Sequence, residues 1–336
     1  MFKFGTSDIG IDLGTANILI YQKGKGIVLN QPSVVAVDTN TNKVLEVGEN
    51  AYSMLGRTAA NIQLIRPLKD GVIADFAITQ EMLNKFLEAL NIKGFFSKPK
   101  ILICCPTNIT TVEKAAIKDV AIRCGAKEVF VEEEPKVAAV GAGLDIFKPL
   151  GNMVIDIGGG TTDIAVLSLG GIVNSSSLKI AGDLFTQSIV DYVKREYHLL
   201  IGQRMAEEVK KTIGTILEPD KTHEYEVRGR DLITGLPKTV SLNETDVCIS
   251  LTPLISEIVR ETKAVLEETA PELSSDIINQ GIVITGGGSL LKNLDKLLEK
   301  ELSVAVYVAE DPLNSVVNGT GMLLEKMGTN SYKYEV

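Results

Sequence analysis

The sequence predicts an α/β protein with two lobes. The chain has 336 residues, beyond the length at which a single hydrophobic core usually stops growing. Segments of strand character alternate with segments of helical period, which is typical of the α/β class. Two strand–turn–strand segments, DIGIDLGTANILI (8–20) and VIDIGGGTTDIAVL (154–167), share one design. In each, an aspartate lies near the end of the first strand, and glycine and threonine form the turn.

The first half is expected to begin with strands and to continue as alternating helices and strands. Strands are predicted at 8–20 (a hairpin through the DLGTAN turn), 26–38, 43–48, 100–106 and 128–135. Helices are predicted at 79–92, 110–125 and 136–144. Thr79 is the expected N-cap of the first helix, and either Thr110 or Thr111 caps the second. Gly125 is expected to end that second helix.

The second half is expected to follow the same plan with longer helices. Three strands joined by glycine turns are predicted within 152–173, and an antiparallel pair within 224–243. Helices are predicted at 183–197, 204–214, about 249–268 and 314–324. The segment 282–302 is expected to form a strand, a glycine turn and a helix that the turn opens.

Charge and composition exclude several classes of protein. The 34 basic and 43 acidic residues give a net charge of −9, which argues against a nucleic-acid partner and gives no general attraction to anionic lipid. The four cysteines form no C-x-x-C pair and the two histidines lie far from them, so neither a zinc site nor a histidine-based triad is expected. Buried free thiols are expected instead, with Cys104 and Cys105 inside an apolar strand. No secretory signal or membrane-spanning run is found, so a cytoplasmic location is expected.

The two matching turns have the chemistry of a phosphate-binding site. Glycine lets backbone N–H groups converge on an anion, and threonine hydroxyls add donors. Asp12 and Asp156 can only accept hydrogen bonds, so they are expected to hold Mg²⁺ through its water shell. A third glycine turn, TGGGSLL (285–291), follows a buried strand where a nucleotide would meet a helix N-terminus. This turn does not fit a Rossmann loop, and the chain has no Walker A lysine motif.

Together these segments resemble the superfamily of actin, heat-shock chaperone ATPases and sugar kinases, through DIGIDLGTAN, VIDIGGGTTDIAVL and IVITGGG. Within it the chain resembles MreB, the bacterial actin family, through GKGIVLNQPSVVAVD, IRPLKDGVIADF, PTNITTVEKAAI and PELSSDIINQGIVITGGG. The segments ICCPTNIT and EEEPKVAAVGAGLDIF resemble the Mbl-type members most. The resemblance covers nearly the whole chain.

The resemblance implies an actin-like (ribonuclease H-like) two-lobed ATPase fold with four subdomains and the nucleotide in a central cleft. The implied subdomains are IA (1–31, 77–148 and 320–336), IB (32–76), IIA (149–180 and 255–319) and IIB (181–254).

The resemblance also implies a site for ATP and Mg²⁺. The family's two phosphate loops correspond to Gly14, Thr15, Ala16 and Asn17, and to Gly158, Gly159, Gly160, Thr161 and Thr162. Its metal-side carboxylates correspond to Asp12 and Asp156. Its adenine-side turn corresponds to Gly286, Gly287 and Gly288. Its ribose and adenine contacts correspond to Glu207 and Lys210, whose i, i+3 spacing puts both on one helix face. Without the resemblance, these two charges favour a solvated face.

Hydrolysis of ATP needs a water aimed at the γ-phosphorus and a group that orients it or accepts its proton. The resemblance assigns these roles to Glu134, before the proline of EEP, and to Thr161. Residue chemistry alone does not choose among Glu132, Glu133 and Glu134. Lys136 stands where many family members have a small or apolar residue, so a typical hydrolysis rate is not assumed.

The function implied by the resemblance is that of a cytoskeletal ATPase. Slow hydrolysis would switch the lobe angle, and a head-to-tail contact that does not close would build a homopolymeric filament. The expected location is peripheral to the inner face of the cytoplasmic membrane, with membrane-bound shape or wall-synthesis proteins as partners. The expected role is cell shape or, in a host without a wall, shape and motility.

Membrane contact is expected at Phe95 and Phe96, in a loop flanked by Lys93, Lys98 and Lys100. Adjacent aromatic residues beside lysines suit insertion at a lipid interface, and the resemblance places an apolar membrane loop here. The alternative is that the two phenylalanines pack inward under the loop.

Two other functions fit parts of the pattern. A small-molecule kinase of the same superfamily would need a substrate pocket with a catalytic aspartate, and no matching sugar-recognition segment is found. A chaperone ATPase would need a following peptide-binding domain, which is not expected after the last helix. Turnover that depends on protein concentration but not on sugars distinguishes the cytoskeletal ATPase from the kinase.

Overall fold

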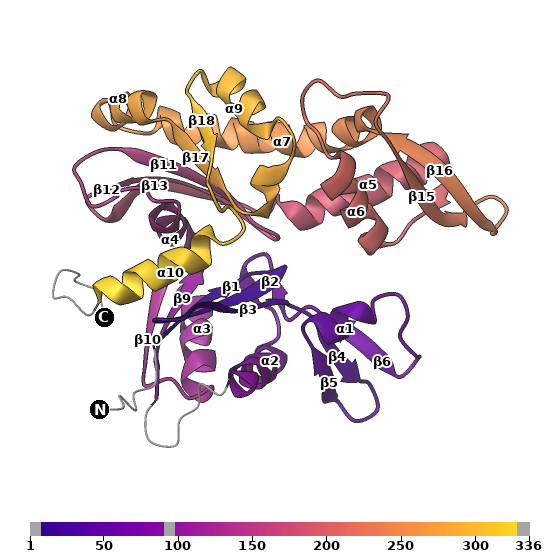
Figure 1. Ribbon diagram of the computed structural model, residues 1–336, viewed down its shortest axis with the longest axis horizontal. Helices are drawn as coiled ribbons and strands as arrows, with labels where there is room; N and C mark the ends of the chain where they lie inside the picture. The colour runs from indigo at the N-terminus through magenta and orange to yellow at the C-terminus, as the bar shows by residue number, and fades with distance from the viewer. Residues whose placement is uncertain (1–7, 91–97, 328–336) are drawn as a thin grey trace. The chain divides into compact units, whose positions relative to one another are not determined.

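The computed structural model describes residues 8–90 and 98–327 (Figure 1). The chain divides into two compact units. Unit 1 comprises Met1–Pro149, Leu167–Ile172 and Leu313–Val336, and unit 2 comprises Leu150–Val166 and Val173–Pro312. Both units combine sheets with helices, as the alternating pattern of the sequence predicted.

Unit 1 is built on a five-stranded sheet in the order β10-β9-β1-β2-β3. Its strands are β1 (Ile9–Leu13), β2 (Asn17–Gln22), β3 (Gly26–Pro32), β9 (Lys100–Cys105) and β10 (Glu128–Glu133). β1 pairs antiparallel with β2 and parallel with β9, which confirms the hairpin predicted at 8–20. The inward side chains of these strands share one hydrophobic core with those of two helices, α2 (Phe76–Ala89) and α3 (Thr111–Arg123).

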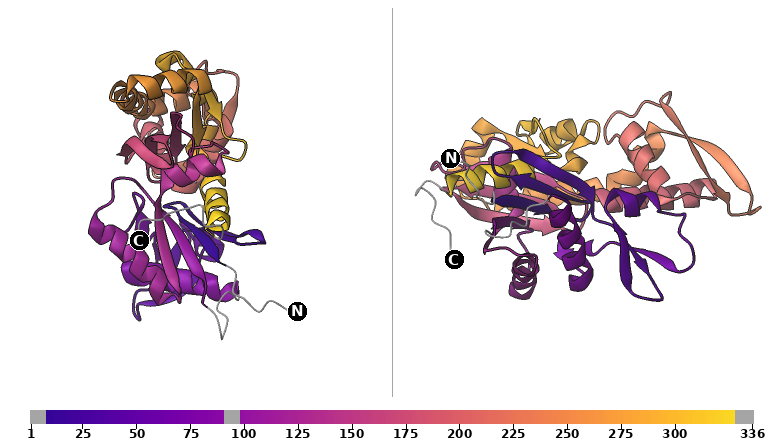
Figure 2. Two further views of the ribbon diagram at one scale, coloured as in Figure 1. Left: turned by 90° about the vertical axis from the view of Figure 1, so that its left-hand side faces the viewer. Right: turned by 60° about the horizontal axis from the view of Figure 1, so that its bottom comes forward.

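Helices cover both faces of this sheet (Figure 2). α2 (Phe76–Ala89) and α3 (Thr111–Arg123) lie on one face, and α4 (Glu134–Gly141) and α10 (Ser315–Lys326) lie on the other. The small residues predicted at 136–144 explain the close packing of α4 on α10. A Cβ on Gly141 would come 1.8 Å from the Ser315 carbonyl oxygen, and one on Gly319 would come 2.0 Å from that of Val137.

Two smaller sheets complete unit 1. One has the order β5-β4-β6 and the other pairs β7 with β8. Their bounds, with the short helix between them, are β4 (Val35–Asp38), β5 (Lys43–Val47), α1 (Glu49–Ser53), β6 (Ile62–Ile65), β7 (Leu68–Lys69) and β8 (Val72–Ile73). The first sheet encloses its own small core of Val34, Ala36 and Ala51.

The helix ends of unit 1 confirm one predicted cap and correct another. Thr110 caps α3 with a capping box, and Gly125 follows its end with a φ of 102°. Thr79 is not the N-cap of α2, as expected, because the helix begins three residues earlier with Asp75 as its cap. The Asp75 carboxylate accepts a hydrogen bond from the Ile78 amide, and Thr79 is buried within the first turns.

Unit 2 is built on a second five-stranded sheet in the order β13-β12-β11-β17-β18. Its strands are β11 (Asn152–Ile157), β12 (Thr162–Ser168), β13 (Gly171–Leu178), β17 (Ile282–Thr285) and β18 (Val306–Val308). The helices of this unit are α5 (Gly182–Tyr197), α6 (Gln203–Ile213), α7 (Glu244–Glu267), α8 (Pro271–Gln280) and α9 (Leu294–Leu302). α8 packs on β11 and α9 on β18, and the helices share a continuous core with the sheet.

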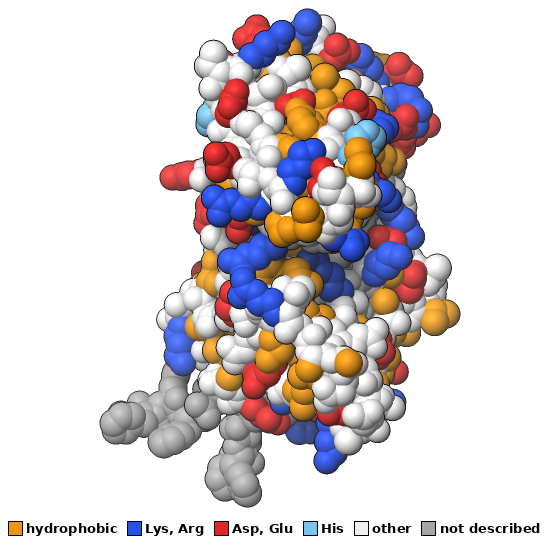
Figure 3. All heavy atoms as spheres, turned by 90° about the vertical axis from the view of Figure 1, so that its right-hand side faces the viewer, with side chains coloured by type: hydrophobic (Ala, Val, Ile, Leu, Met, Phe, Trp, Pro, Cys, Tyr) orange, Lys and Arg blue, Asp and Glu red, His pale blue; other side chains and the backbone are white. Residues whose placement is uncertain are grey.

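A three-stranded sheet, β14 (Leu199–Leu200), β15 (Glu224–Asp231) and β16 (Pro237–Asn243), extends unit 2 and confirms the antiparallel pair predicted at 224–243. The turn after β15 exposes three apolar side chains: Leu232, Ile233 and Leu236. Figure 3 shows hydrophobic side chains grouped on the face of unit 2 that carries this sheet.

α7 begins five residues before its predicted start. Asn243 caps it in a capping box with Asp246, a signal that its apolar periodicity does not contain. All four cysteines are free thiols, as expected; three are buried, and Cys248 on α7 is half-buried.

Candidate functional site

The turn between β1 and β2 in unit 1 requires its glycine. A Cβ on Gly14 would lie 2.6 Å from the carbonyl oxygen of Asn17, too close for any other residue without movement of the turn. Ser33 holds the turn from outside, because its hydroxyl donates to the Gly14 carbonyl (2.7 Å) and its amide donates to the Ala16 carbonyl (2.9 Å). The two hydrogen bonds from Ser33 therefore hold the backbone of this predicted phosphate loop at Gly14 and at Ala16.

The Thr15 hydroxyl oxygen already accepts one hydrogen bond in this turn. Thr15 Oγ1 accepts this bond from the Gly71 amide at 2.9 Å, and the residue is 5% exposed. This bond ties the β1–β2 turn to the segment between β7 and β8. Gly71 lies in the DGVIAD segment that also supports the family resemblance.

Asp12 lies near the end of β1, where burial raises the pKa of its carboxyl to about 7. Its charge also acts on Cys104, which lies on the neighbouring strand β9. Burial raises the pKa of the Cys104 thiol, and the charges of Asp12 and Glu134 raise it further. The predicted metal-side and catalytic carboxylates of unit 1 thus both approach the same buried thiol.

Glu134 is the first residue of α4, directly after β10. Next to it, Lys136 Nζ lies 3.0 Å from Glu132 Oε2, and both side chains are largely buried, at 15% and 12% exposed. Lys136, the unusual residue of this segment, therefore offsets the charge of the first of the three consecutive acids. Glu132, the first of these acids, is held in this ion pair.

The turn between β11 and β12 in unit 2 is closed by a hydrogen bond from the Gly158 amide to the Thr161 carbonyl (2.9 Å). The first turn of α5 braces it. The Gly182 amide donates to the Gly158 carbonyl (3.1 Å), and the Asp183 amide donates to the Gly159 carbonyl (2.8 Å). Sequence reasoning missed this brace, although a glycine followed by an aspartate before an amphipathic helix was a local signal for it.

Glu207 and Lys210 come together on α6, as their spacing predicted. Lys210 Nζ lies 2.6 Å from Glu207 Oε2 and donates to the Gly182 carbonyl (2.8 Å). The Thr186 hydroxyl donates to Glu207 (2.6 Å). Burial alone would raise the pKa of Glu207, but the Lys210 charge and these hydrogen bonds lower it. Both side chains are therefore charged, partly buried and anchored to α5, which differs from a fully solvated face.

The third glycine turn packs directly against the end of β11. A Cβ on Gly286, whose φ is 78°, would lie 2.4 Å from the Ile157 carbonyl and 2.5 Å from Asp156 Oδ1. A Cβ on Gly288 would lie 2.2 Å from Ile157 Cγ2. Asp156 is 2% exposed. Unit 2 thus brings its predicted metal-side carboxylate and its predicted adenine-side turn into contact.

The order predicted for 282–302, a strand, a glycine turn and a helix, is confirmed, but the helix that the turn opens is not an α-helix. Gly287–Leu290 form a short 3-10 helix (η1), and α9 begins only at Leu294. The intervening backbone bonds elsewhere, because the Lys292 amide donates to the Gly214 carbonyl and the Lys292 carbonyl accepts from the Ile216 amide, both at 3.2 Å. A backbone engaged in this way cannot continue a helix from the turn.

The carboxylates suit a hard cation. Asp12 and Asp156 each lie near the end of a strand, beside a glycine turn, and offer the oxygen ligands that Mg²⁺ prefers. Within residues 8–90 and 98–327, no group of three or more His, Cys, Asp or Glu side chains is placed to hold a metal. Each carboxylate by itself suits an ion that takes most of its ligands from water and phosphate.

Replacing Asp12 with asparagine is expected to stabilise the protein without nucleotide at alkaline pH. The folded carboxyl binds its proton more tightly than the unfolded one, so the cost of its charge grows as the pH rises from about 4 to about 7. Asparagine avoids that cost, and urea unfolding at pH 8 should show a gain of about 2 to 4 kcal/mol. The gain should be smaller at pH 5. Equal stabilities at pH 8 would contradict burial as the source of the raised pKa.

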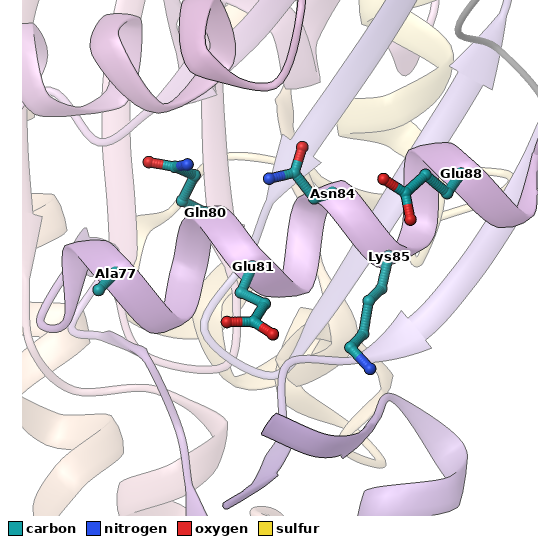
Figure 4. A pocket seen from close by; sticks show the side chains of 6 residues that line it. All are labelled: Ala77, Gln80, Glu81, Asn84, Lys85 and Glu88. Atoms are coloured by element: carbon teal, nitrogen blue, oxygen red, sulfur yellow. The ribbon is translucent and has the colours of Figure 1, made fainter. Parts of the chain in front are cut away.

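A separate pocket lies along α2 and is lined by Ala77, Gln80, Glu81, Asn84, Lys85 and Glu88. Figure 4 shows these side chains in two rows along one helix, each row at i, i+4 spacing. None of the predicted nucleotide residues lines it. We assign it no part in the site.

The predicted membrane residues Phe95 and Phe96 lie outside the described residues, as does Lys93. Of the flanking lysines, Lys100 forms an ion pair with Glu128 at 2.8 Å. In the part of the chain that the structure describes, no helix is both long and apolar enough to cross a membrane.

Known proteins match this chain over nearly its full length. The family model described as MreB/Mbl protein matches residues 6–332. The cell shape-determining protein Mbl of Bacillus cereus is 60% identical over 320 residues, which cover 95% of this chain and 96% of that protein. The cell shape-determining protein MreB of Escherichia coli K12 is 49% identical over 325 residues, which cover 95% of this chain and 94% of that one.

Two solved structures extend this likeness to three dimensions. MreB5 of Spiroplasma citri, bound to AMPPNP in one structure and to ADP in the other, matches with a TM-score of 0.91 at 39% identity. Each match covers 96% of this chain and 97% of the other. The fold is therefore actin-like, and the predicted resemblance to Mbl-type members agrees with the higher identity to Mbl than to MreB. The chain belongs to the MreB/Mbl family of bacterial actin-like cytoskeletal proteins.

Proposed function

We propose that the protein binds Mg·ATP, hydrolyses it slowly and polymerises into membrane-associated filaments that determine cell shape. The observation that carries this proposal is the matching construction of two glycine turns, one in each unit. Each follows a strand that bears an aspartate, and each is fixed by hydrogen bonds from a neighbouring segment. MreB5 of Spiroplasma citri binds AMPPNP and ADP, which supports the same ligand class here.

The proposed phosphate contacts are the two turns. In unit 1 they come from Gly14–Asn17, and in unit 2 from Gly158–Thr162. Asp12 and Asp156 would hold Mg²⁺ through water, and the ion would neutralise charge that develops on the phosphates. Glu207 and Lys210 would face the ribose and base, together with the Gly286–Gly288 turn.

We assign hydrolysis to Glu134 and Thr161. Glu134 would orient the attacking water and accept its proton, and Thr161 would help to position that water. Glu134 is the first residue of α4, directly after β10. The Glu132–Lys136 ion pair beside it is the feature of this chain that would tune the rate.

Self-association into a head-to-tail filament follows from the family. A contact between unlike surfaces that does not close gives an open polymer, and assembly favoured by one nucleotide state needs only different affinities in the two states. The cell shape-determining role of Mbl and MreB relatives supports the same role here.

The assay that tests this proposal is ATP turnover at increasing protein concentration, with and without a panel of sugars. A cytoskeletal ATPase should show turnover per molecule that rises above a threshold concentration and ignores sugars. Phosphorylation of an added sugar, with turnover independent of protein concentration, would instead assign the protein to the kinases of the superfamily.

Membrane attachment is proposed to depend on Phe95 and Phe96. The double change Phe95→Ser and Phe96→Ser should reduce binding to anionic liposomes on the order of 100-fold, because each phenylalanine transfers its apolar surface into lipid. Nucleotide-dependent pelleting without lipid should persist.

The matched control removes an exposed apolar pair in unit 2, through Leu232→Ser and Ile233→Ser. Flotation of both variants with liposomes makes the comparison. Full binding by the phenylalanine variant would move the membrane site elsewhere.

A further inference from the structure

A buried carboxylate in unit 2 collects three donors from two separate segments, 220–223 and 291–293. Glu244, the first residue of α7, is 1% exposed. Its Oε1 accepts from Lys292 Nζ (2.8 Å) and contacts His223 Nδ1 (2.8 Å), and its Oε2 accepts from the Asp220 amide (2.8 Å). No predicted site residue belongs to this group, and the motif analysis did not single it out.

Glu244 is charged in the folded protein. Burial alone would raise the pKa of its carboxyl, but the Asp220 amide, Lys292 and His223 outweigh burial and hold it at about 2. A buried carboxylate that accepts from three donors requires a specific geometry. Loss of one donor leaves part of the buried negative charge uncompensated, which is costly in free energy. Such a group fixes the positions of the segments that supply its donors.

Lys292 joins this carboxylate to the backbone that follows the third glycine turn. Its amide donates to the Gly214 carbonyl (3.2 Å), and its carbonyl accepts from the Ile216 amide (3.2 Å) and the Thr215 hydroxyl (3.3 Å). The side-chain amide of the next residue, Asn293, donates to the Leu217 carbonyl (2.9 Å). The segment 291–293 is therefore joined to the segment 214–217 by hydrogen bonds.

These two segments lead directly to the proposed base-side groups. Residues 214–217 follow α6, which carries Glu207 and Lys210, and the junction is tight because a Cβ on Gly214 would lie 2.1 Å from the Lys210 carbonyl. Residues 291–293 follow the Gly286–Gly288 turn, which rests on β11. The hydrogen-bonded segments 214–217 and 291–293 thus set the separation between α6 and the third glycine turn.

We infer that Glu244 is a positioning residue for nucleotide binding: through Lys292 it holds α6 and the Gly286–Gly288 turn at the separation that the adenosine portion of the ligand requires. This inference rests on the proposed binding of ATP. It concerns the base and ribose side alone, because neither phosphate turn bonds to the Glu244 group in the contacts described above.

The test is isothermal titration of wild type, Glu244→Gln and Lys292→Met with Mg·ATP and with inorganic tripolyphosphate. Tripolyphosphate probes the phosphate turns without a base. We expect each variant to bind ATP roughly tenfold more weakly, as is usual for residues that act through another group. Affinity for tripolyphosphate should stay within twofold of wild type. Lys292→Arg, which keeps the charge, should restore most of the ATP affinity.

Asp231→Asn is the matched control. Asp231 is also a buried carboxylate of unit 2 that accepts backbone amides, from Ile233 and Thr234, and pairs with a lysine, Lys238 at 3.0 Å. This change should lower the melting temperature as the Glu244 change does but leave ATP affinity unaltered. If Glu244→Gln does not fold, Lys292→Met carries the comparison, because it leaves two donors on the carboxylate.

Either of two results for the Glu244→Gln and Lys292→Met variants would overturn the inference. Wild-type affinity for ATP in both variants would show that the Glu244 group serves stability alone. An equal loss of ATP and tripolyphosphate binding would show a general disturbance of unit 2. Failure of wild type itself to bind ATP would overturn the proposed function, and so remains distinct from failure of the variants.

Discussion

Replacement of Glu134 by alanine is expected to reduce phosphate release about 100-fold or more while ATP still binds. A positioned proton acceptor contributes a factor on the order of 10² to 10⁴ to a hydrolytic rate, and Glu134 is the acid that begins α4. Binding should change little, because the proposed phosphate contacts come from the two glycine turns. Single-turnover release of phosphate, with ATP affinity measured on the same samples, checks both expectations.

Glu133→Ala is the control for this change, since Glu133 is the adjacent acid at the end of β10 and is not held by Lys136 in the Glu132 ion pair. It should retain phosphate release within a few-fold of wild type. Normal release by Glu134→Ala would remove Glu134 from its role, and a loss confined to Glu133→Ala would transfer that role to its neighbour.

The second large effect is expected from Asp156→Ala, which should weaken Mg·ATP binding roughly 10- to 100-fold, the range for loss of a hydrogen bond to a charged group. Asp156 is 2% exposed at the end of β11, and the third glycine turn packs against it. Its proposed role is to hold Mg²⁺ through water. The deficit should therefore vanish when both proteins are titrated with ATP in EDTA.

Titration with and without Mg²⁺ separates the metal role from damage to the turn. Unchanged affinity for Mg·ATP would contradict the proposed role of Asp156. A deficit of the same size in EDTA would assign the residue to the shape of the Gly286–Gly288 turn instead.

The strands and the glycine turns were predictable because their signals are local. The β1–β2 hairpin, the cap of α3 at Thr110 and the glycine after α3 each depend on residues close together in sequence. The start of α7 was placed too late because apolar periodicity gives no signal in the first turn, where Asn243 and Asp246 decide the start.

The side-chain contacts that join separate elements were not predictable in the same way. The Lys210 contact with Gly182 and the Lys292 contact with Glu244 join residues on different elements, far apart along the chain. Nothing in the residues between them specifies the pairing, which depends on the tertiary packing of unit 2. The chain after the third glycine turn illustrates the same point, because its bonds to Gly214 and Ile216 separate the short 3-10 helix at the turn from α9.

The central claim is that nucleotide controls assembly. The most direct measurement is sedimentation of the purified protein over a range of concentrations with Mg·ATP, Mg·ADP or no nucleotide, with phosphate release followed in the same tubes. We predict pelleting with Mg·ATP above a critical concentration, less pelleting in the other two conditions, and slow release of phosphate from the pelleted protein. A protein that binds ATP yet stays in the supernatant at every concentration, with or without liposomes, would contradict the account.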